Sequence, residues 1–237
     1  MSLDRQRILI VGGTSGIGLS TAVLASQRGA EVIVTGRTPD RVAEAEQALA
    51  RAGRGVTVDF TDDGSVERLM TEAARIDHLV LAASTEAAWG PFADVPVARL
   101  ERAMQGKLFG YWRCAQAALR ILRPDGSITM LGGAASRTAM PATAALAAVN
   151  GAITQLGQSL ARELAPIRVN VISPGLVDTP AYDGMPADHK QAMFSSVAQR
   201  LPVGRTGRPE DIAEAILMVI GNGFITGALL DVDGGAR

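Results

Sequence analysis

Three glycines, Gly12, Gly16 and Gly18, stand between a short apolar segment and a helical one. Residues 7–11 are rich in β-branched side chains, which is typical of a strand, and residues 19–28 place apolar side chains at helical spacing. Glycine permits a sharp turn, close approach of backbone to phosphate and tight packing of helix on strand. Because the first N–H groups of a helix are unpaired, this pattern predicts a site for a nucleotide pyrophosphate. A glycine-rich turn without a ligand is the alternative interpretation.

A second strand is predicted at residues 31–35, and Gly36, Arg37 and Thr38 follow it. In dinucleotide-binding sheets, an acidic residue at this point binds the free 2′-hydroxyl of NAD. A guanidinium suits a 2′-phosphate instead, because it is always charged and offers several donors. The sequence therefore predicts NADP(H) as cofactor, with a solvated loop cation as the alternative reading of Arg37.

Length and composition favour one α/β domain over residues 1–237. The chain is 47% hydrophobic and has a formal net charge of −1, which indicates small-molecule partners and no nucleic-acid surface. The single cysteine, Cys114, excludes an internal disulfide. No leader-like segment or membrane-length apolar run is found, so we expect a cytoplasmic location without a membrane partner. We expect no metal site.

Strand-like and helix-like segments alternate along the chain, which predicts a Rossmann-like, doubly wound parallel sheet flanked by helices. Residues 178–205 follow the carboxyl end of a strand and contain a short helical piece at 188–199, so they are predicted to form a substrate lid, an ordinary long connection being the alternative. The further strands are expected at 55–58, 78–82, 127–131, 167–172 and 228–232, and the further helices at 39–52, 64–75, 96–122, 143–165 and 209–221.

With these motifs the chain resembles the short-chain dehydrogenase/reductase family nearly end to end. The resemblance rests on the glycine turn, on residues 59–62 after the third strand, on 167–170 followed by 173–179, and on the ending 226–235. The chain departs from it at Val11, where the family has threonine, and at 81–84, where the family has Asn-Asn-Ala-Gly. Read together, motifs and resemblance imply these cofactor-binding residues: Gly12, Thr14, Ser15, Gly16, Ile17, Gly18, Arg37, Thr38, Asp59, Phe60, Ala82, Asn150, Pro174, Gly175, Val177 and Thr179.

The catalytic asparagine, serine, tyrosine and lysine of the family fall, by the same resemblance, at Lys107, Gly133, Leu146 and Asn150. In the family the tyrosine is a general acid whose pKa the lysine lowers. Leucine transfers no proton, and positioned acid–base catalysis is typically worth ~10²–10⁴ in rate. Asn150 can still hydrogen-bond the nicotinamide ribose, but a neutral amide does not lower the pKa of a neighbour.

Lys107 is the leading candidate for a substitute proton donor. In the expected helix 96–122 it lies on the same side as Leu100, Met104 and Tyr111. A lysine aimed inward needs a partner or has a depressed pKa, which would allow proton donation near neutrality. The alternative is a lysine whose stem packs while its ammonium reaches solvent.

Several other side chains are candidates with plainer alternatives. Ser136 and Thr143 are suited to orient a substrate oxygen, although such loop residues more often cap turns. His78 is expected far from the carboxyl ends of the strands. The remaining candidates are the lid residues Tyr182, Asp183 and His189, and the loop aromatics Trp89 and Phe92.

Two classes of function follow, and a third is weaker. The first is an NADP(H)-dependent oxidoreductase that acts on a small carbonyl, imine or activated alkene and takes its proton from Lys107, a lid residue or water. The second is a catalytically silent NADP(H)-binding sensor or partner subunit, and the third is cofactor-assisted lyase or isomerase chemistry. The resemblance also implies a homodimer or homotetramer, paired through the long helices or through the last helix and strand.

Overall fold

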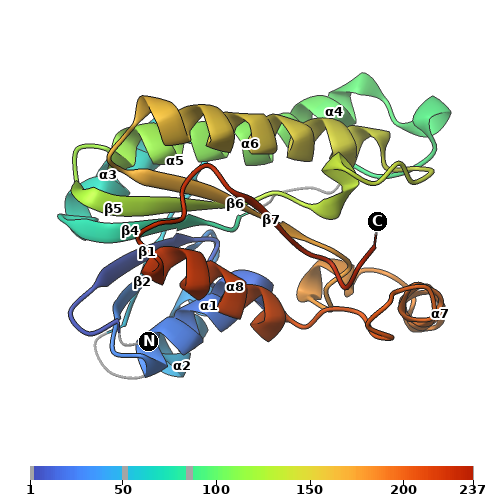
Figure 1. Ribbon diagram of the computed structural model, residues 1–237, viewed down its shortest axis with the longest axis horizontal. Coiled ribbons are helices and arrows are strands. Elements are labelled where there is room, and N and C mark those ends of the chain that lie inside the picture. The colour runs from blue at the N-terminus through green and yellow to red at the C-terminus, as the bar shows by residue number, and fades with distance from the viewer. Residues whose placement is uncertain (1–2, 50–52, 84–87, 237) are drawn as a thin grey trace.

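The computed structural model describes residues 3–49, 53–83 and 88–236, and in these ranges the strands form one parallel sheet (Figure 1). The strand order is β3-β2-β1-β4-β5-β6-β7. Because the chain moves outward from β1 to β3 and then returns to β4 beside β1, the carboxyl ends of β1 and β4 form a topological switch point. The strands are β1 (Arg7–Val11), β2 (Glu31–Gly36), β3 (Arg54–Thr57), β4 (Ile76–Leu81), β5 (Leu122–Leu131), β6 (Arg168–Pro174) and β7 (Leu229–Val232).

Helices cover both faces of the sheet, so the predicted doubly wound α/β fold is confirmed. Figure 1 shows α1, α2 and α8 on one face, and α3, α5 and α6 on the other, while α7 stands apart beyond the carboxyl end of β6. The helices are α1 (Gly16–Gln27), α2 (Pro39–Ala48), α3 (Asp63–Ala73), α4 (Val97–Met104), α5 (Gly110–Ala118), α6 (Ala144–Glu163), α7 (Ala187–Ala198) and α8 (Pro209–Gly221).

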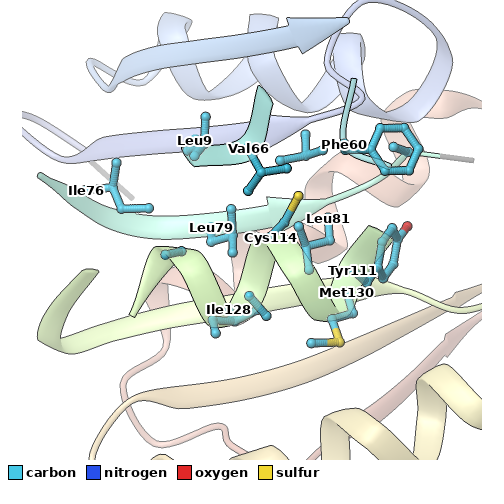
Figure 2. Packing of buried hydrophobic residues seen from close by; sticks show 14 of the residues in the cluster. Leu9, Phe60, Val66, Ile76, Leu79, Leu81, Tyr111, Cys114, Ile128 and Met130 are labelled. Carbon is cyan, nitrogen blue, oxygen red and sulfur yellow. The ribbon is translucent and has the colours of Figure 1, made fainter. Parts of the chain in front are cut away.

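The central strands are apolar on both faces, as expected for strands covered by helices on each side. Along β1, Leu9 packs into the cluster under α3 and α5, whereas Ile8 and Ile10 pack into the cluster over α1 and α8. Figure 2 shows the first cluster, in which Leu79 and Met130 lie close to α5. Because both faces of the sheet are buried, the parallel strands are held in place and their carboxyl ends lie along one edge. This edge carries the candidate site.

The helix predicted at 96–122 differs in the structure. It consists of α4, a π-helical turn at Gln105–Phe109 and α5, and it ends at Ala118. Strand β5 already begins at Leu122, which pairs with Ile76 of β4. Because this pairing requires an extended backbone at residue 122, the helix ends before it. The helix predicted at 39–52 ends at Ala48, and residues 50–52 lie outside the described ranges.

His78 lies near the amino end of β4, far from the carboxyl edge, as predicted. Its Nδ1 is 2.8 Å from Ser127 Oγ and its Nε2 is 3.1 Å from Gln6 Oε1. Burial lowers the pKa of His78 to about 4, because removal from water disfavours the charged imidazolium. The imidazole is therefore neutral at physiological pH and serves the fold rather than the site.

We expect His78 to make stability fall in mild acid. The unfolded chain binds a proton near pH 6.5 and the folded chain only near pH 4, so stability is complete above about 6.5 and falls as the pH drops toward 4. Denaturant unfolding at pH 7 and 4.5 should show an additional loss of about 2–3 kcal/mol relative to His78→Gln, which does not titrate. Equal losses in the two proteins would contradict this account.

Candidate functional site

The turn between β1 and α1 has the shape that a phosphate requires. A side chain at Gly18 would overlap the carbonyl oxygen of Gly12, and Gly12 itself has a φ of +84° and lies against Ala83. Ser15 caps α1 in an extended conformation without a side-chain hydrogen bond, and no acidic residue stands in the first turn of this helix. The first N–H groups of α1 are thus available to an anion, which fits a dinucleotide pyrophosphate.

The end of β2 forms the side on which an adenosine would lie. The side chain of Thr14 occupies the space that a Cβ at Gly36 would need, so this glycine allows the two segments to approach closely. Arg37 follows and is exposed. The hydroxyl and N–H of Thr61 donate to the Asp59 carboxylate at 2.7 and 2.9 Å and hold the pKa of Asp59 below its usual range. Asp59 is therefore an ionised acceptor at this edge.

The segment after β6 folds back onto the glycine turn. Gly175 donates its N–H to Val232 O at 3.1 Å, and Val177 bridges to Gly207. A Cβ at Gly16 would lie 3.3 Å from the Cβ of Thr179. Two segments far apart in sequence, both predicted to hold the cofactor, thus meet at one place on the sheet edge.

Lys107 lies in the middle of the π-helical turn, and its side chain points inward, as its helical spacing predicts. Its Nζ donates to the carbonyl oxygen of Gly132 at 2.8 Å and to Asn150 Oδ1 at 2.7 Å. Burial lowers the pKa of Lys107 to about 8, and no other cause contributes. Both acceptors are neutral, and an ammonium has three N–H groups, so one donor remains without an acceptor among the described residues.

Asn150 and Gly133 occupy complementary space. An ammonium only donates hydrogen bonds, so the atom of Asn150 that faces Lys107 is Oδ1, and Nδ2 is turned toward Gly133. A Cβ at Gly133 would lie 2.5 Å from this Nδ2. The φ of Gly133 is 165°, an extended conformation open to any residue, so contact with the amide, not backbone strain, requires glycine here.

Leu146 stands one helical turn before Asn150 on α6, on the same face, and is half-buried. The residues that the sequence analysis assigns to catalysis therefore come from three elements, namely the π-helical turn, the end of β5 and the first half of α6. Lys107 hydrogen-bonds to Asn150, and Asn150 packs against Gly133, whereas Leu146 adds only apolar surface.

The other candidates make local contacts. Ser136 Oγ donates to Gly133 O at 2.9 Å and Thr143 Oγ1 donates to Met140 O at 2.7 Å, as turn-capping residues do. In the segment 178–205, Tyr182 packs edge-to-face on Phe194, Asp183 accepts from Lys190, and His189 is exposed. Trp89 and Phe92 are also exposed, and Ser84 lies outside the described residues.

Two features were missed by sequence reasoning. Gly132 binds Lys107 through its backbone carbonyl, which no residue type signals. Arg137, in the loop after β5, forms an ion pair of 3.2 Å with Asp231 at the end of β7, although nothing in their spacing indicates a partner. Within the described ranges, no three His, Cys, Asp or Glu side chains are grouped to hold a metal ion, and no helix is long and apolar enough to cross a bilayer.

Comparison with known proteins identifies the class. Residues 11–237 match the family model described as enoyl-(acyl carrier protein) reductase. A cis-4-hydroxycyclohexanecarboxylate dehydrogenase of Sinomonas cyclohexanicum is 35% identical over 244 residues, covering 97% of this chain and 96% of the relative. A 2-(S)-hydroxypropyl-CoM dehydrogenase of Xanthobacter autotrophicus is 30% identical, covering 98% and 97%.

Solved structures agree. A small-chain dehydrogenase crystallised in complex with NADPH has a TM-score of 0.87 and 38% identity, covering 98% of this chain and 99% of its own. The MalC reductase/Diels-Alderase of Malbranchea aurantiaca has a TM-score of 0.91 and 27% identity, covering 99% and 97%. The chain belongs to the short-chain dehydrogenase/reductase family. It is an oxidoreductase of this family.

The packing of Gly133 on Asn150 gives a test of the site geometry. We expect Gly133→Ala to destabilise the protein by about 1–3 kcal/mol, because the added methyl must displace the amide. In an Asn150→Ala background the same change should cost much less, since the obstructing group is gone. A double-mutant cycle in denaturant measures this coupling, and equal costs in both backgrounds would show that the two residues do not compete for space.

Proposed function

We propose that this protein is an NADP(H)-dependent oxidoreductase of a small carbonyl compound, imine or activated alkene, in which Lys107 replaces the family's tyrosine as proton donor. The observation that carries the proposal is the ammonium held by Gly132 O and Asn150 Oδ1 with its third N–H available. A donor works best when its pKa is close to the working pH, and a pKa of about 8 meets this condition.

The resemblance supports this role through a reciprocal exchange. It places the family's asparagine at position 107 and its lysine at position 150, whereas this chain carries lysine at the first and asparagine at the second, hydrogen-bonded to one another. The cation thus enters the site from the π-helical turn rather than from α6. Leu146, at the tyrosine position, contributes no proton, so the exchange leaves Lys107 as the acidic group at this edge.

The described residues fit NADP(H) along the carboxyl edge. The N-terminus of α1 would bind the pyrophosphate, Arg37 the 2′-phosphate, and the segment 174–179 the nicotinamide end. When bound, the nicotinamide supplies or accepts the hydride. Lys107 then donates its proton to the substrate atom that becomes basic, and the apolar side chain of Leu146 limits the access of water to that atom.

Three finer features belong to the same proposal. The segment 178–205 acts as a lid, in which Lys190 joins Asp178 and Asp183, each at 3.1 Å. The protein assembles as a homodimer or homotetramer, for which Trp112 and Phe109 offer exposed apolar surface along the α5 region. A cytoplasmic location accords with small-molecule redox chemistry.

Replacement of Lys107 tests the proton donor. The assay measures NADPH oxidation with a panel of ketones, imines and activated alkenes. Lys107→Met and Lys107→Arg should each lower kcat by at least about 10²-fold. Methionine has no proton to donate, and arginine does not release its proton. The wild-type kcat should fall as the pH rises through about 8, since only the protonated lysine donates. The exposed control Arg162→Met should leave both unchanged.

Two outcomes would weigh against the proposal. A Lys107→Met protein with the wild-type kcat would remove Lys107 from the reaction. NADPH binding without turnover of any substrate class would favour a silent binding protein.

Arg37 is expected to set the preference for the phosphorylated cofactor. Its guanidinium would make charge-assisted hydrogen bonds to the 2′-phosphate, so Arg37→Gln should raise the Kd for NADPH by about tenfold or more and leave that for NADH nearly unchanged. Arg41→Gln, an exposed charge loss four residues further on, is the matched control. Fluorescence titration measures both constants, and a parallel loss for NADPH and NADH would place the phosphate elsewhere.

A further inference from the structure

The cation of Lys107 lies in the nicotinamide half of the site. The glycine turn after β1 suits the pyrophosphate and Arg37 after β2 marks the adenosine side, so the other end of the dinucleotide lies over the carboxyl ends of β4, β5 and β6. Gly132, whose carbonyl binds the ammonium, directly follows β5, and its N–H bonds Ile172 O at the end of β6. The positive charge is therefore held near the carboxyl ends of β5 and β6, within the region over which the nicotinamide end would lie.

This charge has no counter-ion among the described residues. Its acceptors are a backbone carbonyl and a side-chain amide, and no charged side chain contributes to its pKa. Carbonyl dipoles orient an ammonium without neutralising it. In a site from which water is displaced, an uncompensated charge acts strongly on any charge brought near it.

The oxidised and reduced cofactors differ by one positive charge, and that charge lies on the nicotinamide ring. The pyrophosphate, the 2′-phosphate and the ribose groups are the same in both forms, so every other contact cancels in a comparison of the two. The Lys107 ammonium repels the positively charged ring of NADP⁺, but it does not repel the uncharged ring of NADPH. This difference is a direct consequence of where the cation sits.

Resting on the function proposed above, we propose that the ammonium of Lys107 makes the site selective for NADPH over NADP⁺, so that the protein fills with reduced cofactor, releases the oxidised form and works in the reducing direction. Asn150 and Gly132 are positioning residues in this scheme, because they hold the cation at the end of β5.

The pH range of this selectivity follows from the surroundings of Lys107. On α5, burial raises the pKa values of Tyr111 and of Cys114, the latter to about 12, so both stay uncharged. The α6 side chains nearest the ammonium and Gly132, Asn150 and Thr154, do not titrate. Arg137 in the loop after β5 is paired with Asp231. Among the described residues named here, Lys107 is thus the group whose charge changes between about pH 6.5 and 9.5.

The test is the ratio of the Kd for NADP⁺ to the Kd for NADPH, measured by calorimetry or fluorescence between pH 6.5 and 9.5 on the purified protein. For the wild type we expect a ratio at pH 6.5 at least tenfold above that of Lys107→Met, falling toward the Met value by pH 9.5. Titration of the 2′-phosphate affects both nucleotides alike and cancels in the ratio. No substrate is needed.

Two variants separate charge from shape. Lys107→Met keeps much of the side-chain volume and removes the charge, so its ratio should be low and independent of pH. Lys107→Arg keeps the charge at every pH tested, so its ratio should stay high up to pH 9.5. If the arginine does not fit and the variant fails to fold, the ratio of the two Kd values is still compared between the wild type and Lys107→Met across the pH range. That comparison alone tests redox-state selection.

Proton release gives a second readout. If NADP⁺ lowers the pKa of Lys107 by one unit from about 8, its binding at pH 7.5 should release roughly half a proton, whereas NADPH binding should release none from this group. Calorimetry in buffers of different ionisation enthalpy counts these protons, and Lys107→Met should show no difference between the two nucleotides.

The outcomes distinguish this inference from the function on which it rests. Equal ratios in wild type and Lys107→Met across the pH range would overturn redox-state selection while leaving the oxidoreductase proposal intact. Failure to bind either nucleotide would overturn both.

Discussion

A half-buried lysine whose ammonium is held, among the described residues, by two neutral oxygen atoms is the constraint on which the proposed site depends. Such a charge is costly to remove from water, and two carbonyl groups offset that cost only in part, which is why the pKa of Lys107 falls to about 8. The surrounding structure follows from it. A π-helical turn carries Lys107, and the amide of Asn150 directs its oxygen toward the ammonium. Position 133 is glycine, so no side chain clashes with the nitrogen of that amide. Lys107 without Asn150 would lose one of its two acceptors, and Asn150 beside a side chain at position 133 would clash with it.

The cofactor half of the site is built on a different principle. Its geometry depends on backbone and on the absence of side chains, as at Gly12 and Gly18, rather than on titratable groups. The backbone at Gly12 and Gly18 thereby fits the dinucleotide turn that the proposed function requires. The two halves meet where the segment after β6 returns to the glycine turn, at Thr179 and Gly16. That contact involves none of Lys107, Gly133, Leu146 and Asn150.

Much of this architecture follows from the sequence, because burial on both sides of a parallel sheet leaves long apolar strands separated by amphipathic helices. β1 and α8 have the predicted bounds, and Lys107 points inward as its spacing with Leu100 and Met104 predicts. The π-helical turn was not predictable, because a shift of backbone hydrogen bonds is set by tertiary contacts and leaves no periodic signal. The early start of β5 was hidden by Pro124, Asp125 and Gly126, which are typical turn residues. The role of the Gly132 carbonyl as an acceptor for Lys107 was not predictable either, since every residue has a backbone carbonyl.

The two cations at opposite ends of the site act by different physics. Arg37 is exposed, and under the proposed function its guanidinium would contact a phosphate that both redox forms carry, so its attraction would be screened by salt and would not depend on redox state. Lys107 is held at the end of β5 with a pKa of about 8, so its effect is weakly screened, depends on pH and falls on the group whose charge changes during the reaction. Under the two proposals, one cation would identify the nucleotide and the other would respond to its oxidation. Loss of the proton in the chemical step would remove the very charge that excludes NADP⁺, so proton transfer and cofactor exchange are linked through a single side chain, and the site regains its preference for NADPH only when Lys107 is protonated again.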